Sequence, residues 1–107
     1  MTKIKFFKKQ DGITGFECSG HTKEILCAAL SGMTQSCMIG LTHVLKIKVL
    51  VKRNDNDGYL KIELPKKIDQ EKMKLSQVLF NTLLISIEDL IDGYSKYISM
   101  EVIENDY

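Results

Sequence analysis

The sequence has few of the residues that mark specialised classes of protein: it has three cysteines, one proline and no tryptophan in 107 residues. Three cysteines are too few for a disulfide scaffold, so we expect free thiols in a reducing compartment. Lysines interrupt the first nine residues, which leaves no apolar core for a secretory signal peptide. We find no run of about 20 apolar residues that would span a bilayer. These absences predict a cytoplasmic protein without a membrane segment.

The sequence also lacks a strong charge of either sign. Its 15 Lys and Arg face 14 Asp and Glu, and the net charge of +1 gives no overall attraction to nucleic acid or to a membrane surface. Apolar residues make up 44% of the chain, which excludes wholesale disorder. A chain of 107 residues is expected to form a single domain, residues 1–107.

Hydropathy periods and turn residues predict seven elements in the order ββαββαβ. The expected strands cover residues 2–8, 13–18, 44–51, 59–64 and 99–104, and the expected helices cover residues 24–43 and 69–94, the second beginning at residue 69 or 72. Hairpins followed by helices predict an α+β fold, a two-layer sandwich of a mostly antiparallel sheet with two helices on one face.

Each predicted helix carries an apolar stripe near the helical period, and Thr22 is the candidate N-cap of the first helix. The stripe of the first helix comprises Leu26, Ala29, Leu30, Met33, Cys37 and Leu41. The stripe of the second helix comprises Leu75, Val78, Leu79, Leu83, Ile87, Leu90, Ile91 and Tyr94. We expect both stripes to pack in the core.

The candidate chemistry lies where the second strand gives way to the first helix. His21 follows Gly20 on a loop, and Cys27 falls in the first two turns of the helix. A helix N-terminus and a nearby imidazole both favour the thiolate, and an imidazole can act as general base. Glu24 and Ser31 lie three residues before and four after Cys27, so a helix places both on its face. Cysteines early in helices are also common core residues, so spacing alone leaves both interpretations open.

Two motifs resemble the ribosomal-processing cysteine protease family, Prp: Gly-His-Thr at residues 20–22 and Leu-Cys-Ala-Ala-Leu-Ser at residues 26–31. The resemblance extends over essentially the whole chain through its length and element order. It implies a catalytic dyad of His21 and Cys27, with supporting roles for Glu24 and Ser31. Many family members have a longer Gly-rich loop between the histidine and the cysteine, where five residues stand in this chain.

The resemblance implies a cysteine endopeptidase that removes the N-terminal extension of a large-subunit ribosomal protein, number twenty-seven. The cysteine thiolate would be the nucleophile and the histidine the general base. The implied partners are that ribosomal-protein peptide and a second copy of the chain in a homodimer. We expect no cofactor, no metal, no direct contact with nucleic acid and no membrane.

Zinc binding is one alternative interpretation of the same segment. Cys18 and His21 have the spacing of half a zinc site, and Cys27, Cys37 and His43 follow in the sequence. Cys27 and Cys37 are ten residues apart, which is about 15 Å along a helix at 1.5 Å per residue. Two zinc ligands cannot be that far apart, so we do not expect a metal site.

Two non-catalytic alternatives use other parts of the chain. A ribosome- or RNA-associated binding module would present a basic strand face made of Lys46, Lys48, Lys52 and Arg53, but no aromatic stacking motif accompanies it. A pure interaction protein would use the apolar tail made of Tyr94, Tyr97, Ile98 and Met100. The sequence does not separate this tail from an ordinary core.

Overall fold

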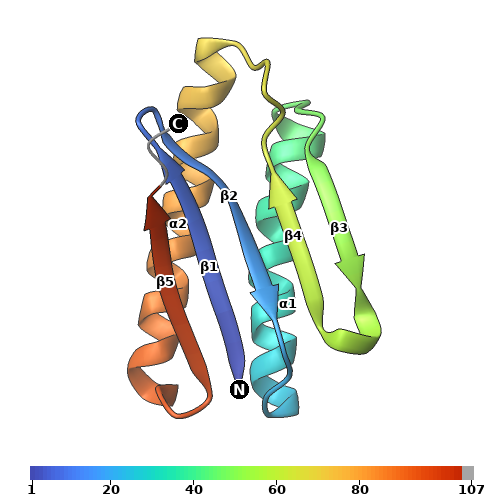
Figure 1. Ribbon diagram of the computed structural model, residues 1–107, viewed down its shortest axis with the longest axis vertical. Coiled ribbons are helices and arrows are strands. Elements are labelled where there is room, and N and C mark those ends of the chain that lie inside the picture. Colours follow the sequence, from blue (N-terminus) through green and yellow to red (C-terminus); the bar gives the residue numbers. More distant parts are fainter. Residues whose placement is uncertain (105–107) are drawn as a thin grey trace.

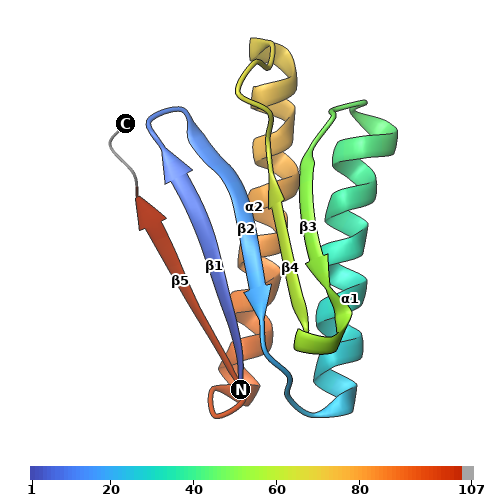
Figure 2. The same ribbon diagram turned by 45° about the vertical axis from the view of Figure 1, so that its right-hand side comes forward.

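The computed structural model describes residues 1–104, so the last three residues of the predicted domain 1–107 lie outside the described part. The described elements are β1 (Thr2–Lys9), β2 (Gly12–Ser19), α1 (Glu24–Ile39), η1 (Gly40–Val44), β3 (Leu50–Asn54), η2 (Asp55–Asp57), β4 (Tyr59–Glu63), α2 (Gln70–Tyr94) and β5 (Ile98–Glu104). Both long helices lie on one face of the sheet, and the opposite face is open (Figures 1 and 2). The predicted α+β two-layer sandwich with the order ββαββαβ is confirmed.

The sheet has the strand order β3-β4-β2-β1-β5. Every neighbouring pair is antiparallel except β1 with β5, which the long α2 crossover makes parallel. The register places Phe6 beside Phe16 and Phe16 beside Ile62, and all three side chains are fully buried on the helix side. These residues form the centre of the core between the sheet and the helices.

Helix α2 begins where the sequence indicates, because the Asp69 side chain accepts a hydrogen bond from the amide of Lys72 at 2.8 Å. Its buried residues are Ser76, Phe80, Leu83 and Ile87. The predicted stripe is therefore right at Leu83 and Ile87, but it is wrong at Leu75, Val78 and Tyr94, which are 42%, 63% and 43% exposed. Helix α2 has apolar residues of its own on several faces, so the period of its apolar residues did not identify the face that the sheet covers.

Helix α1 begins at Glu24 with Lys23 at the N-cap position and no side-chain cap, so the predicted Thr22 cap is wrong. Its buried residues are Leu26, Leu30, Thr34 and Cys37. By length and composition alone, Glu24–Val44 would be long and apolar enough to cross a membrane, so the prediction that no such segment exists fails by that criterion. The core helix of a globular domain meets the same criterion, and in this structure α1 packs its buried residues in the core.

The predicted strand at residues 44–51 is also wrong, because β3 covers Leu50–Asn54 instead. A π-helical turn, η1, extends α1 to Val44, and the amides of Leu45 and Ile47 donate back to carbonyls of this turn at 2.9 Å. Ile47 is buried although it lies outside a strand. In this irregular segment every second residue is apolar and packs under the end of α1. The same alternation is what the sequence of a half-buried strand would show.

Candidate active site

The loop that leaves β2 is shaped by a glycine. Gly20 has a φ of +90°, and a side chain there would place its Cβ 2.5 Å from the carbonyl oxygen of Met1. Its own carbonyl lies 3.5 Å from the hydroxyl of Thr2 at the start of β1. Only a glycine fits this turn away from the sheet, so the position of His21 immediately after it is set by the backbone.

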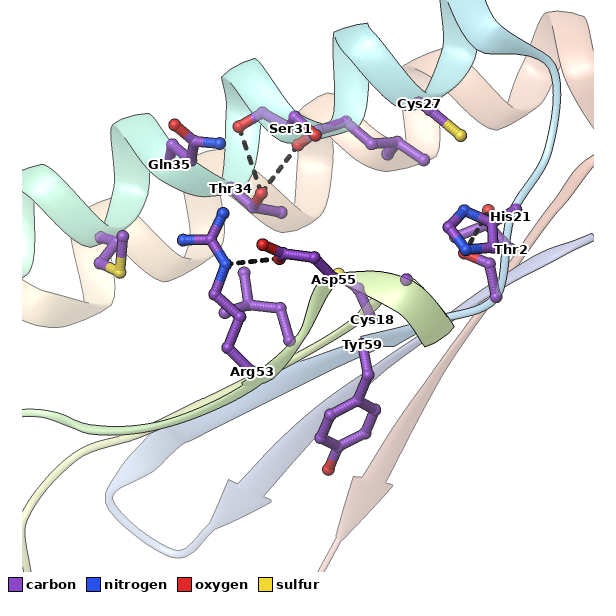
Figure 3. Close-up of a pocket in the computed structure, with 15 residues that line it drawn as sticks. Thr2, Cys18, His21, Cys27, Ser31, Thr34, Gln35, Arg53, Asp55 and Tyr59 are labelled. Carbon is purple, nitrogen blue, oxygen red and sulfur yellow. Dashed lines mark hydrogen bonds and ion pairs between the residues drawn. The ribbon is translucent and has the colours of Figure 1, made fainter.

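A cleft of about 250 Å³ lies between α1 and the β3–β4 hairpin, at the end of the sheet where β2 stops (Figure 3). Its lining residues include His21 and Cys27, then Ser31, Gln35 and Met38 along α1, with Arg53 and Asp55 from the hairpin. The structure therefore brings both residues of the predicted dyad, and the predicted supporting Ser31, to one cavity.

The ring of His21 points from the loop into the cleft (Figure 3). Its Nε2 lies 3.2 Å from the carbonyl oxygen of Asn56, in the turn between β3 and β4. His21 is exposed to solvent, so a substrate has access to the imidazole. The histidine thus has a polar partner from a segment 35 residues away, which no local pattern in the sequence indicates.

Cys27 is the fourth residue of α1 and is half-buried. Its sulfur lies 3.5 Å from both the amide nitrogen and the carbonyl oxygen of Thr22. Figure 3 shows the sulfur directed toward the loop that carries His21. Within residues 1–104 no hydrogen bond joins the sulfur to the imidazole, and each has a backbone partner of its own.

The two supporting residues are placed differently. Ser31 is exposed in the cleft about one helical turn after Cys27, as the spacing predicts. Glu24 is exposed at the first position of α1, outside the residues that line the cleft. In the described part of the chain it makes no hydrogen bond to His21, so its predicted orienting role stays a prediction.

The other two thiols are in apolar surroundings. Burial, together with the Glu17 carboxylate, raises the pKa of Cys18 to about 12, and burial raises the pKa of Cys37 to about 11. Both thiols therefore remain protonated near neutral pH, where a protonated thiol is a poor nucleophile. In residues 1–104 there is no group of three or more His, Cys, Asp or Glu side chains placed to hold a metal ion.

The hairpin contributes residues that sequence reasoning missed. Arg53 and Asp55 form an ion pair at 2.7 Å on the wall opposite α1 (Figure 3). The basic strand face expected for an RNA-binding module is wrong, because Lys46 and Lys48 precede β3 and Arg53 turns into the cleft. The only sequence signal in this region was the polar turn at residues 54–58, which did not indicate that the turn contacts His21.

A cysteine early in a helix and a histidine in the same cleft are the two side chains that enzymes with a thiol nucleophile use. The family model described as cysteine protease Prp matches residues 1–99. The chain therefore belongs to the Prp family of ribosomal-processing cysteine proteases, and it is a thiol-dependent peptide hydrolase.

One curated relative and two solved structures are similar to this chain. The ribosomal processing cysteine protease Prp of Bacillus subtilis (strain 168) is 22% identical over 89 residues, which cover 78% of this chain and 80% of that protein. The crystal structure of SMU.848 from Streptococcus mutans has a TM-score of 0.87 at 22% identity, covering 98% of this chain and 96% of that one. The Prp structure from S. aureus with a covalently linked product peptide has a TM-score of 0.83 at 19% identity, covering 96% and 100%.

Proposed function

We propose that this chain is a cysteine endopeptidase in which Cys27 is the nucleophile and His21 the general base. One observation carries the proposal: two residues from different elements, a loop histidine and a helical cysteine, line the same cleft. The state of the other two thiols supports it, since burial keeps Cys18 and Cys37 protonated. Cys27 lines the cleft with His21, whereas Cys18, which also lines it, has its pKa raised to about 12 by burial and by Glu17.

In the proposed reaction the imidazole of His21 accepts the proton of the Cys27 thiol, and the thiolate attacks the scissile carbonyl carbon. The tetrahedral intermediate collapses, the C–N bond breaks, and the imidazolium gives its proton to the leaving amine. A water molecule, deprotonated by the same imidazole, then hydrolyses the thioester. The acid product leaves and Cys27 regains its proton.

The proposed substrate is the N-terminal extension of large-subunit ribosomal protein number twenty-seven, as the family resemblance implies. A cleft open to solvent between a helix and an edge hairpin suits a peptide in extended conformation. Ser31 lines the cleft one turn away from the nucleophile and would offer its hydroxyl to that peptide. The resemblance also leads us to propose a homodimer in the cytoplasm.

A peptide that spans the extension and the residues after it tests the proposal. The wild-type chain should cut it at one bond, which mass spectrometry identifies, and Cys27→Ala should abolish cleavage. His21→Ala should lower kcat by about 10²–10⁴, the usual contribution of a general acid–base group. The matched control is Cys37→Ala, which removes a core thiol that does not line the cleft and should leave kcat within about twofold.

Two results would contradict this function. Cleavage by Cys27→Ala at the wild-type rate would show that Cys27 is not the nucleophile. Equal cleavage of a scrambled peptide would show that the substrate assignment is wrong. Light scattering of the same preparations measures the mass of the particle and tests the dimer separately from the chemistry.

A further inference from the structure

We propose that the turn between β3 and β4 positions His21, with the carbonyl oxygen of Asn56 holding the ring hydrogen on Nε2 and leaving Nδ1 as the base. The catalytic consequence rests on the proposed function, whereas the state of the ring does not. Asn56 and Gly58 are then positioning residues for the histidine. The segment that orients the base is remote in sequence from the dyad motif.

The hydrogen bond itself selects the tautomer. A carbonyl oxygen can only accept, so its contact with Nε2 at 3.2 Å requires the hydrogen to be on that nitrogen. A neutral imidazole carries one ring hydrogen, and Nδ1 therefore keeps its lone pair. Nδ1 is the atom that can take the thiol proton of Cys27 and later return it to the leaving amine.

The turn that supplies this carbonyl is fixed by its own hydrogen bonds. The Asn54 side-chain oxygen accepts from the amides of Asn56 at 3.1 Å and Asp57 at 3.4 Å, and its nitrogen donates to the Asp57 carboxylate at 2.9 Å. The amide of Gly58 donates to the carbonyl of Asp55 at 3.2 Å. The direction of the Asn56 carbonyl is therefore set by the turn and does not depend on His21.

Gly58 allows this turn to approach the histidine. It has a left-handed φ of +62°, and a Cβ there would lie 2.8 Å from Cε1 and 3.0 Å from Nδ1 of His21. The same Cβ would lie 2.6 Å from the carbonyl oxygen of Gly20. Real Cβ atoms do not come so close to other atoms, so any other residue at position 58 must displace the ring or the turn.

The predicted orienting residue for His21 was Glu24, and the described residues show no bond between the two side chains. The structure instead supplies an uncharged backbone oxygen at Nε2. A backbone carbonyl fixes the direction and the tautomer of an imidazole as a carboxylate would, but it adds no negative charge beside the imidazolium.

The tautomer can be measured without any substrate. In the full chain labelled with ¹⁵N histidine, His21→Ala and His43→Gln assign the two ring signals, and the spectrum is recorded above the imidazole titration. We expect Nε2 of His21 to carry the hydrogen and Nδ1 to be the bare nitrogen. A spectrum with the hydrogen on Nδ1 would overturn the proposal.

Two variants test the positioning role. Gly58→Ala adds the clashing Cβ, and Asn54→Ala loosens the turn without adding an atom near the ring. We expect kcat for peptide cleavage to fall about tenfold or more in Gly58→Ala and severalfold in Asn54→Ala, with KM little changed. In both variants the His21 ring signals should shift toward a mixture of tautomers.

The matched controls lie away from the cleft. Gly12→Ala introduces the same residue at another positive φ, where its Cβ meets the side chain of Gln77 instead of the histidine. Asn81→Ala removes a side-chain hydrogen bond to a backbone carbonyl on α2. Both should keep kcat within about twofold and leave the His21 signals in place.

The outcomes separate this proposal from the proposed function. In one outcome the wild-type chain cleaves the peptide, and the folded variants Asn54→Ala and Gly58→Ala have the same kcat and the same His21 ring signals as wild type. The positioning role is then wrong and the protease function stands. If wild type cleaves nothing while His21 holds its hydrogen on Nε2 and loses that state in the variants, the turn still positions the ring and the proposed function fails. If Gly58→Ala does not fold, Asn54→Ala and the wild-type spectrum still decide.

Discussion

At the scale of single residues, the three thiols show how position determines chemistry. Cys37 is buried in α1, and Cys18 lies half-buried at the floor of the cleft beside Glu17. Both have a raised pKa because the charged thiolate loses its hydration. Cys27 lies at the start of the same helix as Cys37, where it is half-buried and its sulfur is 3.5 Å from the amide nitrogen of Thr22. Side chains of one type thus differ in reactivity through their surroundings.

We predict that iodoacetamide labels Cys27 at least about tenfold faster than Cys18 or Cys37 near pH 7.5, because alkylation requires the thiolate. Peptide mapping by mass spectrometry after short exposures of the folded chain measures the three rates. The denatured chain is the control, in which the three thiols should react alike. Faster labelling of Cys37 in the folded chain would contradict the activation of the helix-start site.

At the scale of elements, α2 shows how packing chooses one face of a largely apolar helix. Phe80 is fully buried and meets the ring of Phe16 edge-on, with ring centroids 6.3 Å apart. Val78, two positions earlier, is 63% exposed. The two residues belong to the same apolar segment, but only one lies under the sheet.

This difference predicts unequal costs of truncation. Phe80→Ala should lower the free energy of unfolding by about 3–5 kcal/mol, since it leaves a cavity in the core. Val78→Ala, the matched control on the exposed side, should change it by no more than about 0.5 kcal/mol. Urea unfolding followed by circular dichroism compares them. Equal losses would contradict the burial of Phe80 and the exposure of Val78.

At the scale of the whole molecule, the sheet topology assembles the site. The β3–β4 hairpin lies on the far side of β2 from β1, and its turn reaches the same end of the sheet as the loop after β2 (Figure 1). His21 and Asn56 meet there although 35 residues separate them. The same packing that builds the cleft also buries two thiols, and this makes the stability of the fold depend on pH.

We predict that alkaline pH destabilises the fold partly through Cys37. Its pKa is about 11 in the folded chain against an ordinary 9.0, so above pH 9 the unfolded chain loses this proton first and stability falls as pH rises toward 11. The free energy of unfolding that is lost between pH 9 and 11 should be smaller in Cys37→Ala than in wild type by about 2 kcal/mol. Gly32→Ala, a substitution into open space, is the control and should keep the wild-type loss. Equal losses in wild type and Cys37→Ala would show that this thiol is not protected.

The sequence by itself determined the element order, most strand positions and the motif that holds His21, Cys27 and Ser31. These features depend on contacts between near neighbours, such as the Asp69 cap of α2 and the alternation of Ile4 and Phe6 in β1. A turn glycine and the 3.6-residue period act over a few residues, so they are visible in a single chain.

Only the tertiary structure decided how α1 ends, which face of α2 is buried and what lies beside the histidine. The segment after α1 alternates like a strand, but Ile47 is held under the helix by its bond to the carbonyl of Leu41. Asn56 and Gly58 appear in the sequence only as turn residues. Their contact with His21 exists because the sheet register brings two distant loops together, and no period or local motif encodes a distance of that kind.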